Sequence, residues 1–121
     1  MATTRKTPRF KSGLEKKAWD MMPKGTEYES DKIKYLVEHV YHPDFTLGPN
    51  TYIETKGRFL SADRAKHLYI KEQHPEVKVY FLFGNAENKL TKSSKTSYAD
   101  WCTKYGFEYA DFYKQGIPKE W

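Results

Sequence analysis

Three stretches of the chain space their apolar residues three and four positions apart, as expected of helices that bury one face. The first begins at Ser12, and Glu15 stands three positions later, so the pair has the spacing of a capping box. The third ends before Gly106, a residue type that commonly terminates a helix. The predicted helices cover residues 12–22, 62–73 and 97–105.

Other stretches follow the two-residue alternation of a strand. Gly48-Pro49-Asn50 is a turn sequence that would join two of them in a hairpin. Val77–Phe83 is almost continuously apolar, as expected of a strand covered on both faces. The predicted strands cover residues 28–40, 41–45, 52–56, 77–83 and 107–111. Strands interspersed with helices predict an α/β fold, in which helices pack on a sheet.

Length and composition favour one intracellular domain. A chain of 121 residues is long enough for a single core without disulfides, and Cys102 is the only cysteine. We therefore expect one domain over residues 1–121 and a reducing, cytoplasmic compartment. No apolar run approaches the roughly 20 residues of a membrane span, so we expect no membrane association. Residues 1–11 are basic and predict a flexible arm.

The net charge of +5 favours a polyanionic partner such as nucleic acid. The excess is modest, and solvated basic segments explain it equally well. Its distribution is more informative, because much of it gathers in two clusters. These are Arg5, Lys6, Arg9 and Lys11 near the N-terminus, and Lys89, Lys92 and Lys95 in a polar loop.

Candidate chemistry centres on the predicted hairpin. Asp44 follows a proline on one arm, and Glu54 and Lys56 stand on the other, which is the PD-(D/E)xK pattern of metal-dependent nucleases. Since side chains alternate along a strand, Glu54 and Lys56 should share a face, with Cα atoms about 6.6 Å apart. The hairpin would return Asp44 to them, and the backbone carbonyl of Thr55 would reach toward the edge of the site.

These residue types suit phosphodiester hydrolysis. Mg²⁺ prefers oxygen ligands, and two carboxylates could hold it so that it polarises the phosphate and lowers the pKa of a bound water. The lysine could orient that water, assist its deprotonation or stabilise charge in the transition state. An ordinary alternative exists, because Pro-Asp is common at turns and Glu-x-Lys on an exposed strand is usually a solvated ion pair. The apolar neighbours Phe45 and Ile53 favour the site.

Other candidate residues have competing interpretations. The capping box explains Glu15 without any function, yet a helix just before the hairpin could also deliver this carboxylate to a metal. A zinc site is disfavoured, because the four histidines lack ligand spacing and no second cysteine exists. No glycine-rich phosphate loop occurs, so we expect no nucleotide cofactor. His67 falls on the charged face of the second helix and is expected at the surface.

Ordered motifs run through nearly the whole chain. They are Arg9–Glu15, Pro43-Asp44-Phe45, Ile53–Gly57, Asp63–Leu68, Glu72–Glu76, Thr96-Ser97-Tyr98 and Ile117–Trp121. Together they resemble the phage T7 endonuclease I family, junction-resolving nucleases of the PD-(D/E)xK superfamily. The resemblance implies a restriction-endonuclease-like mixed sheet flanked by helices, in a homodimer that exchanges segments between its subunits. The segment between Glu15 and Asp44 is a few residues shorter than expected for the family.

The resemblance also implies roles for individual residues. It gives catalysis to Glu15, Asp44, Glu54 and Lys56. It implies that the three acids and the Thr55 carbonyl bind Mg²⁺, and that Mn²⁺ could substitute for Mg²⁺. Glu15 of one subunit would complete the site of the other. This implication overturns the preference for Glu15 as a simple cap.

The expected function is a metal-dependent, structure-selective DNA endonuclease. It would resolve four-way (Holliday) junctions and other branched DNA by paired phosphodiester hydrolysis in the cytoplasm of an infected bacterial host. Two alternatives remain: a nicking or mismatch-repair nuclease of the same fold, and a DNA-binding protein that no longer cuts. The residues expected to contact DNA are Arg5, Lys6, Arg9, Lys11, Arg58, Arg64, His67, Lys89, Lys92 and Lys95.

Overall fold

The structure, a computed structural model, describes residues 7–121. The chain divides into two compact units, Met1–His39 and Val40–Trp121, where the sequence predicted one domain without an internal boundary. We call them the N-terminal unit and the sheet unit. No helix within residues 7–121 is long and apolar enough to cross a membrane.

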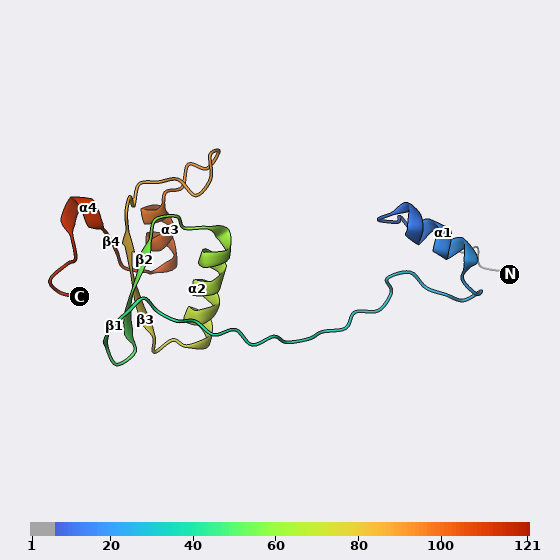
Figure 1. The fold of residues 1–121 in the computed structure, drawn as a ribbon, viewed down its shortest axis with the longest axis horizontal. Helices are drawn as coiled ribbons and strands as arrows, with labels where there is room; N and C mark the ends of the chain where they lie inside the picture. Colours follow the sequence, from blue (N-terminus) through green and yellow to red (C-terminus); the bar gives the residue numbers. More distant parts are fainter. Residues whose placement is uncertain (1–6) are drawn as a thin grey trace. The chain divides into compact units, whose positions relative to one another are not determined.

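Helix α1 (Gly13–Met21) is the regular element of the N-terminal unit (Figure 1). The Ser12 hydroxyl oxygen accepts a hydrogen bond from the Glu15 amide at 3.2 Å, so the predicted N-cap is confirmed. The apolar spacing predicted one buried face, but the helix buries none of its side chains fully, and Leu14 and Met21 are exposed. The N-cap therefore forms although no α1 side chain is fully buried.

Aromatic contacts hold the chain around α1. The Phe10 ring lies 4.9 Å from the Tyr28 ring and 5.9 Å from the Trp19 ring, measured between centroids. The Lys11 ammonium pairs with Glu29 at 2.8 Å. The predicted arm over residues 1–11 thus ends in contacts with its own unit, and its first six residues lie outside the described range.

The strand predicted over residues 28–40 is wrong. Residues 30–43 have no regular secondary structure, and residues 31–40 are exposed throughout. Ile33 and Leu36 are 90% and 101% exposed. The alternation of polar and apolar positions is present, but no described strand pairs with this segment. Because a strand needs a hydrogen-bonded neighbour, the pattern alone does not produce one.

Four strands in the order β1-β2-β3-β4 form the sheet unit (Figure 1). Strand β1 (Phe45–Gly48) pairs antiparallel with β2 (Thr51–Lys56) through the predicted hairpin. Strands β3 (Lys78–Phe83) and β4 (Tyr109–Asp111) continue the sheet in parallel. The mixed sheet with flanking helices expected from the sequence is therefore confirmed.

Three helices accompany the sheet. Helix α2 (Ser61–Gln73) follows β2, and α3 (Tyr98–Tyr105) follows β3. Ser97 caps α3 through a reciprocal capping box. Gly106 ends the helix in the left-handed conformation at φ 75°, as predicted. The short α4 (Phe112–Gln115) directly continues β4 and was not predicted.

The sheet separates two cores of unequal size. Helices α2 and α3 cover one face, and α4 and the C-terminal tail lie on the other (Figure 1). The helix-covered face holds the larger core, which includes Phe59, Phe81, Phe83, Tyr98 and Trp101. The other face holds Ile53, Tyr80, Leu82 and Ala110 against Trp121. Because Glu54 and Lys56 pair in register with Phe81 and Phe83, both point to the helix-covered face.

Candidate active site

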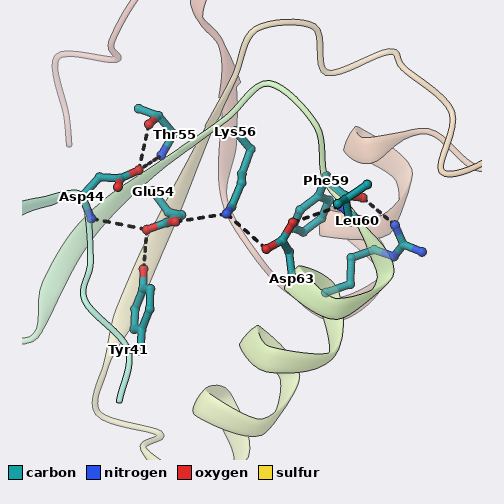
Figure 2. Close-up of polar contacts among 9 residues, drawn as sticks. Tyr41, Asp44, Glu54, Thr55, Lys56, Phe59, Leu60 and Asp63 are labelled. Carbon is teal, nitrogen blue, oxygen red and sulfur yellow. Dashed lines mark hydrogen bonds and ion pairs between the residues drawn. The ribbon is translucent and has the colours of Figure 1, made fainter. Parts of the chain in front are cut away.

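Strand β2 brings two of the predicted catalytic residues together. Glu54 is only 5% exposed, although it is a carboxylate, and Lys56 follows on the same face. The Lys56 ammonium lies 3.3 Å from Glu54 Oε2 (Figure 2). The shared face predicted from strand alternation is confirmed, and the pair is largely shielded from solvent rather than a solvated surface ion pair.

Asp44 lies just before β1, where the hairpin returns it to β2. Its amide donates a hydrogen bond to Glu54 Oε1 at 3.3 Å. Its own Oδ2 accepts bonds from the Thr55 amide at 2.9 Å and from the Thr55 hydroxyl at 2.8 Å (Figure 2). The structure therefore joins both acids and the lysine of the predicted pattern.

The Thr55 carbonyl lies on the same strand edge as these contacts. In a strand, the N–H and C=O groups of one residue point toward the same side. Since the Thr55 amide donates to Asp44, its carbonyl is directed to the edge that Asp44 occupies. This direction agrees with the expectation that the carbonyl reaches the edge of the site.

Two further side chains contact the site and were missed as functional residues in the sequence. The Tyr41 hydroxyl donates to Glu54 Oε1 at 2.7 Å, and Asp63 Oδ1 lies 3.3 Å from the Lys56 ammonium (Figure 2). Asp63 stands in the first turn of α2, only seven residues after Lys56, and this closeness in the sequence could have marked it as a candidate site residue. Tyr41 was predicted to lie in a strand over residues 41–45, but the strand begins only at Phe45 and Tyr41 lies in an irregular segment.

The charges of the site are set by these contacts. Partial burial lowers the pKa of Lys56, but the carboxylates of Asp63 and Glu54 outweigh it and leave the pKa above its ordinary value. Partial burial likewise raises the pKa of Asp44, but hydrogen bonds from Thr55 outweigh it and lower the pKa overall. At neutral pH the lysine is therefore a cation and Asp44 an anion.

Glu15 belongs to the N-terminal unit. Its Oε2 accepts a hydrogen bond from the Tyr28 hydroxyl at 2.6 Å, and its Oε1 accepts one from the Ser12 hydroxyl at 3.3 Å. The Tyr28 bond, outweighing slight desolvation, lowers the pKa of this carboxyl. Glu15 is thus an anion at neutral pH, and its part in the catalytic site stays a prediction.

Comparison with known proteins identifies the family. The sequence pattern described as phage endonuclease I matches residues 1–121. The chain belongs to the phage endonuclease I family. It is 44% identical to the endonuclease I of Escherichia phage T7 over 123 residues, which covers 97% of this chain and 80% of that protein. It is 45% identical to endodeoxyribonuclease 1 of Enterobacteria phage T3 over 108 residues, which covers 84% of this chain and 71% of that protein.

The donor atoms of this family member suit a hard cation. Asp44 and Glu54 supply carboxylate oxygens, and Thr55 adds a carbonyl at the same edge. Oxygen ligands of this kind favour Mg²⁺ over zinc, which prefers nitrogen and sulfur. Within residues 7–121, no three acidic, histidine or cysteine side chains gather around one point. Among them, Asp44 and Glu54 are joined by a hydrogen bond from the Asp44 amide to Glu54 Oε1.

Nine of the ten residues predicted to contact DNA fall into three groups. Arg9, Lys11, Arg58, Lys89, Lys92 and Lys95 are exposed. Arg64 is partly buried and donates a hydrogen bond to the Phe59 carbonyl at 2.6 Å. Arg5 and Lys6 lie outside the described residues. Contact with DNA stays a prediction for all of them.

The expected surface position of His67 is wrong. His67 is 1% exposed and lies between the rings of Tyr41 and Phe81, at centroid distances of 5.0 and 4.8 Å. Helix α2 turns this position toward the sheet, because Leu68 and the neighbouring core pack there. Buried in this way, the imidazole offers no surface to DNA, and burial lowers its pKa to about 4.

Proposed function

We propose that this endonuclease is a Mg²⁺-dependent, structure-selective DNA endonuclease that resolves four-way junctions. One observation carries the proposal: the sheet unit joins Asp44, Glu54 and Lys56 through direct contacts in a chain of the phage endonuclease I family. The T3 relative is named an endodeoxyribonuclease, which supports DNA as the substrate. Its phage relatives support action inside an infected bacterial cell.

The charges of the site support different roles for the metal ion and for Lys56. When bound, Mg²⁺ would polarise the scissile phosphate and acidify a water molecule, while Mn²⁺ would substitute for it. Asp44, Glu54 and the Thr55 carbonyl would hold the ion. Because Lys56 is protonated at neutral pH, it would stabilise the negative charge that develops on the phosphate rather than remove a proton.

We further propose a restriction-endonuclease-like fold completed by segment exchange in a homodimer. The support is apolar surface that the two units leave uncovered. Helix α1 exposes Leu14 and Met21. The irregular segment exposes Ile33, Tyr35, Leu36, Val37 and Val40. Residues 31–40 of two copies could pair as strands, which would satisfy the alternation that lacks a partner within one chain.

The exchange would give Glu15 its role. Asp44 and Glu54 of the sheet unit would supply two carboxylates to a metal site, and Glu15 of a second copy would supply the third. Exposed lysines at 89, 92 and 95 and the arginines at 9 and 58 would contact phosphates, so binding should weaken steeply with salt.

The proposal is tested with a four-way junction and a linear duplex of matched sequence, each incubated with Mg²⁺, Ca²⁺ or a chelator. We expect the junction to be nicked in two strands in Mg²⁺ and bound without cutting in Ca²⁺. Glu54→Ala and Lys56→Ala should bind the junction and leave it intact. Exposed Lys114→Ala, which pairs with Glu87 rather than with the site, is the matched control.

Each proposed property has its own contradicting result. Equal cutting of duplex and junction would contradict the proposed junction selectivity and favour the nicking or repair nuclease. Tight binding without cleavage in Mg²⁺ would favour the inactive DNA-binding protein. Full activity of Glu54→Ala would contradict the proposal that Glu54 belongs to the active site.

A further inference from the structure

The carboxylate of Glu54 is held from two sides. The Tyr41 hydroxyl donates to Oε1 at 2.7 Å, and the Lys56 ammonium lies 3.3 Å from Oε2 (Figure 2). The Asp44 amide also reaches Oε1, at 3.3 Å. Of these partners, Tyr41 makes the shortest contact and belongs to none of the motifs that identify the site.

Tyr41 is itself fixed by its neighbours. Its ring stands edge-on against His67, with centroids 5.0 Å apart and planes at 82°. His67 in turn stands edge-on against Phe81 of β3, at 4.8 Å and 80°. The ammonium of Lys66 lies 5.2 Å from the Tyr41 ring centroid. The hydroxyl is therefore presented to Glu54 by a ring that rests on the core.

His67 supports this ring by packing alone. Neither of its ring nitrogens has a hydrogen-bond partner among the described residues, and the side chain is 1% exposed. An imidazole that neither donates to nor accepts from the Tyr41 hydroxyl leaves that hydroxyl free to donate to Glu54. Through Tyr41, the larger core is thus connected to one oxygen of the Glu54 carboxylate.

From this geometry we infer that Tyr41 is a positioning residue that holds the Glu54 carboxylate in one orientation toward the bound metal ion. A carboxylate free to rotate presents its oxygens in several directions, and fixing it in advance lowers the cost of binding a cation. Hydrogen bonds to metal-binding carboxylates commonly change metal affinity or activity 10- to 100-fold. The inference rests on the proposed role of Glu54 as a metal ligand.

Tyr41→Phe tests the inference, because it removes the hydroxyl and keeps the ring that packs on His67. Tyr69→Phe is the matched control, since Tyr69 is an exposed tyrosine on the same helix as His67. Three quantities are measured on the full chain: the Mg²⁺ concentration giving half-maximal cleavage, the rise in melting temperature caused by Mn²⁺ without DNA, and the affinity for junction DNA in Ca²⁺-free, chelator-containing buffer. All rates are compared well below both melting temperatures, so a difference in stability does not enter.

For Tyr41→Phe we expect the half-maximal Mg²⁺ concentration to rise about 10-fold or more. The thermal shift caused by Mn²⁺ should fall, while the affinity for junction DNA in Ca²⁺-free, chelator-containing buffer stays within twofold of wild type. Tyr69→Phe should match wild type in all three quantities. A residue that only packs would leave the metal requirement unchanged.

Two failures are distinguishable with Glu54→Ala in the same series. If Glu54→Ala is inactive and Tyr41→Phe has a wild-type metal requirement and Mn²⁺ shift, the inference about Tyr41 is overturned and the proposed site stands. If Glu54→Ala cuts at the wild-type rate, the proposed site itself fails and the inference fails with it.

Discussion

The two units of the chain treat a similar pair of residues differently. In the sheet unit, Tyr41 donates to Glu54 at 2.7 Å above a buried aromatic core. In the N-terminal unit, Tyr28 donates to Glu15 at 2.6 Å, but the helix that carries Glu15 buries no side chain. Both units fix a carboxylate with a tyrosine, and the sheet unit alone supports it with a core.

This difference shows that a local sequence signal such as an N-cap can start a helix but does not bury it. Ser12 and Ser97 both cap helices with an acid three residues later, so caps form in both units. Full burial requires a larger packed surface, which α2 and α3 give to the sheet. In the N-terminal unit, Trp19 of α1 meets the rings of Phe10 and Tyr28, and no α1 residue is fully buried. The exposed side chains of Leu14 and Met21 agree with the proposed exchange of this segment with a second copy.

The largest expected effect contrasts Phe59→Ala with Leu14→Ala. Phe59 is 1% exposed and contacts four other rings of the core, so its loss should lower the free energy of unfolding by about 3–5 kcal/mol. Leu14→Ala should leave unfolding of the sheet unit within about 0.5 kcal/mol of wild type, because Leu14 is exposed in its own unit. Urea unfolding followed by tryptophan fluorescence measures both.

The same pair of substitutions tests the proposed dimer. We expect Leu14→Ala to weaken self-association in sedimentation runs over a range of protein concentrations. Equal destabilisation of the sheet unit by the two substitutions would break the comparison, because it would mean that α1 already shares the core of its own chain.

A smaller effect should appear as pH falls. Burial lowers the pKa of His67 to about 4, below the value near 6.5 of an unfolded chain, so the unfolded state binds more protons between these values. Stability should therefore fall by about 3 kcal/mol from pH 6.5 to 4. The lowered pKa values of Asp44 and Asp63 act in a separate window, below about 3.8.

His67→Leu isolates this contribution. The substitution fills similar space without the two unpaired nitrogens, and it should flatten the dependence between pH 6.5 and 4 in chemical unfolding curves. An unchanged slope in the variant would mean that the loss arises elsewhere in the chain.

The smallest effect compares the two caps. Ser97 is buried and makes a reciprocal capping box with Asp100, so Ser97→Ala should cost about 1–2 kcal/mol. Ser12 is exposed, and Ser12→Ala should cost about 0.5 kcal/mol. Thermal unfolding of both variants measures the difference. A larger cost at Ser12 would contradict the view that the sheet unit carries most of the stability.

The sequence predicted those features that depend on neighbouring residues. The hairpin around Gly48-Pro49-Asn50, the α3 cap and the common face of Glu54 and Lys56 all follow from short-range geometry. Features that depend on tertiary partners were missed or misplaced. Residues 28–40 have strand alternation without a described partner, and His67 is polar yet buried against two rings.

The site divides in the same way. The acids and the lysine of the hairpin were predictable, because one turn joins them. The contact of Tyr41 was not, because the strand predicted over residues 41–45 is irregular at Tyr41, and the course of that segment sets where its hydroxyl lies. Asp63 stands within one of the family motifs, but its contact with Lys56 depends on how α2 packs against the sheet.

Subunit mixing tests the central claim, that Glu15 of one copy completes the site built by Asp44, Glu54 and Lys56 of another. Heterodimers of Glu15→Ala with Lys56→Ala are isolated by two different affinity tags after coexpression, and each homodimer serves as an inactive control. Exchange predicts one intact site per heterodimer, so a four-way junction should be nicked in one strand. If Glu15 serves its own chain, both sites are damaged, and a heterodimer that binds the junction without nicking it would contradict the account.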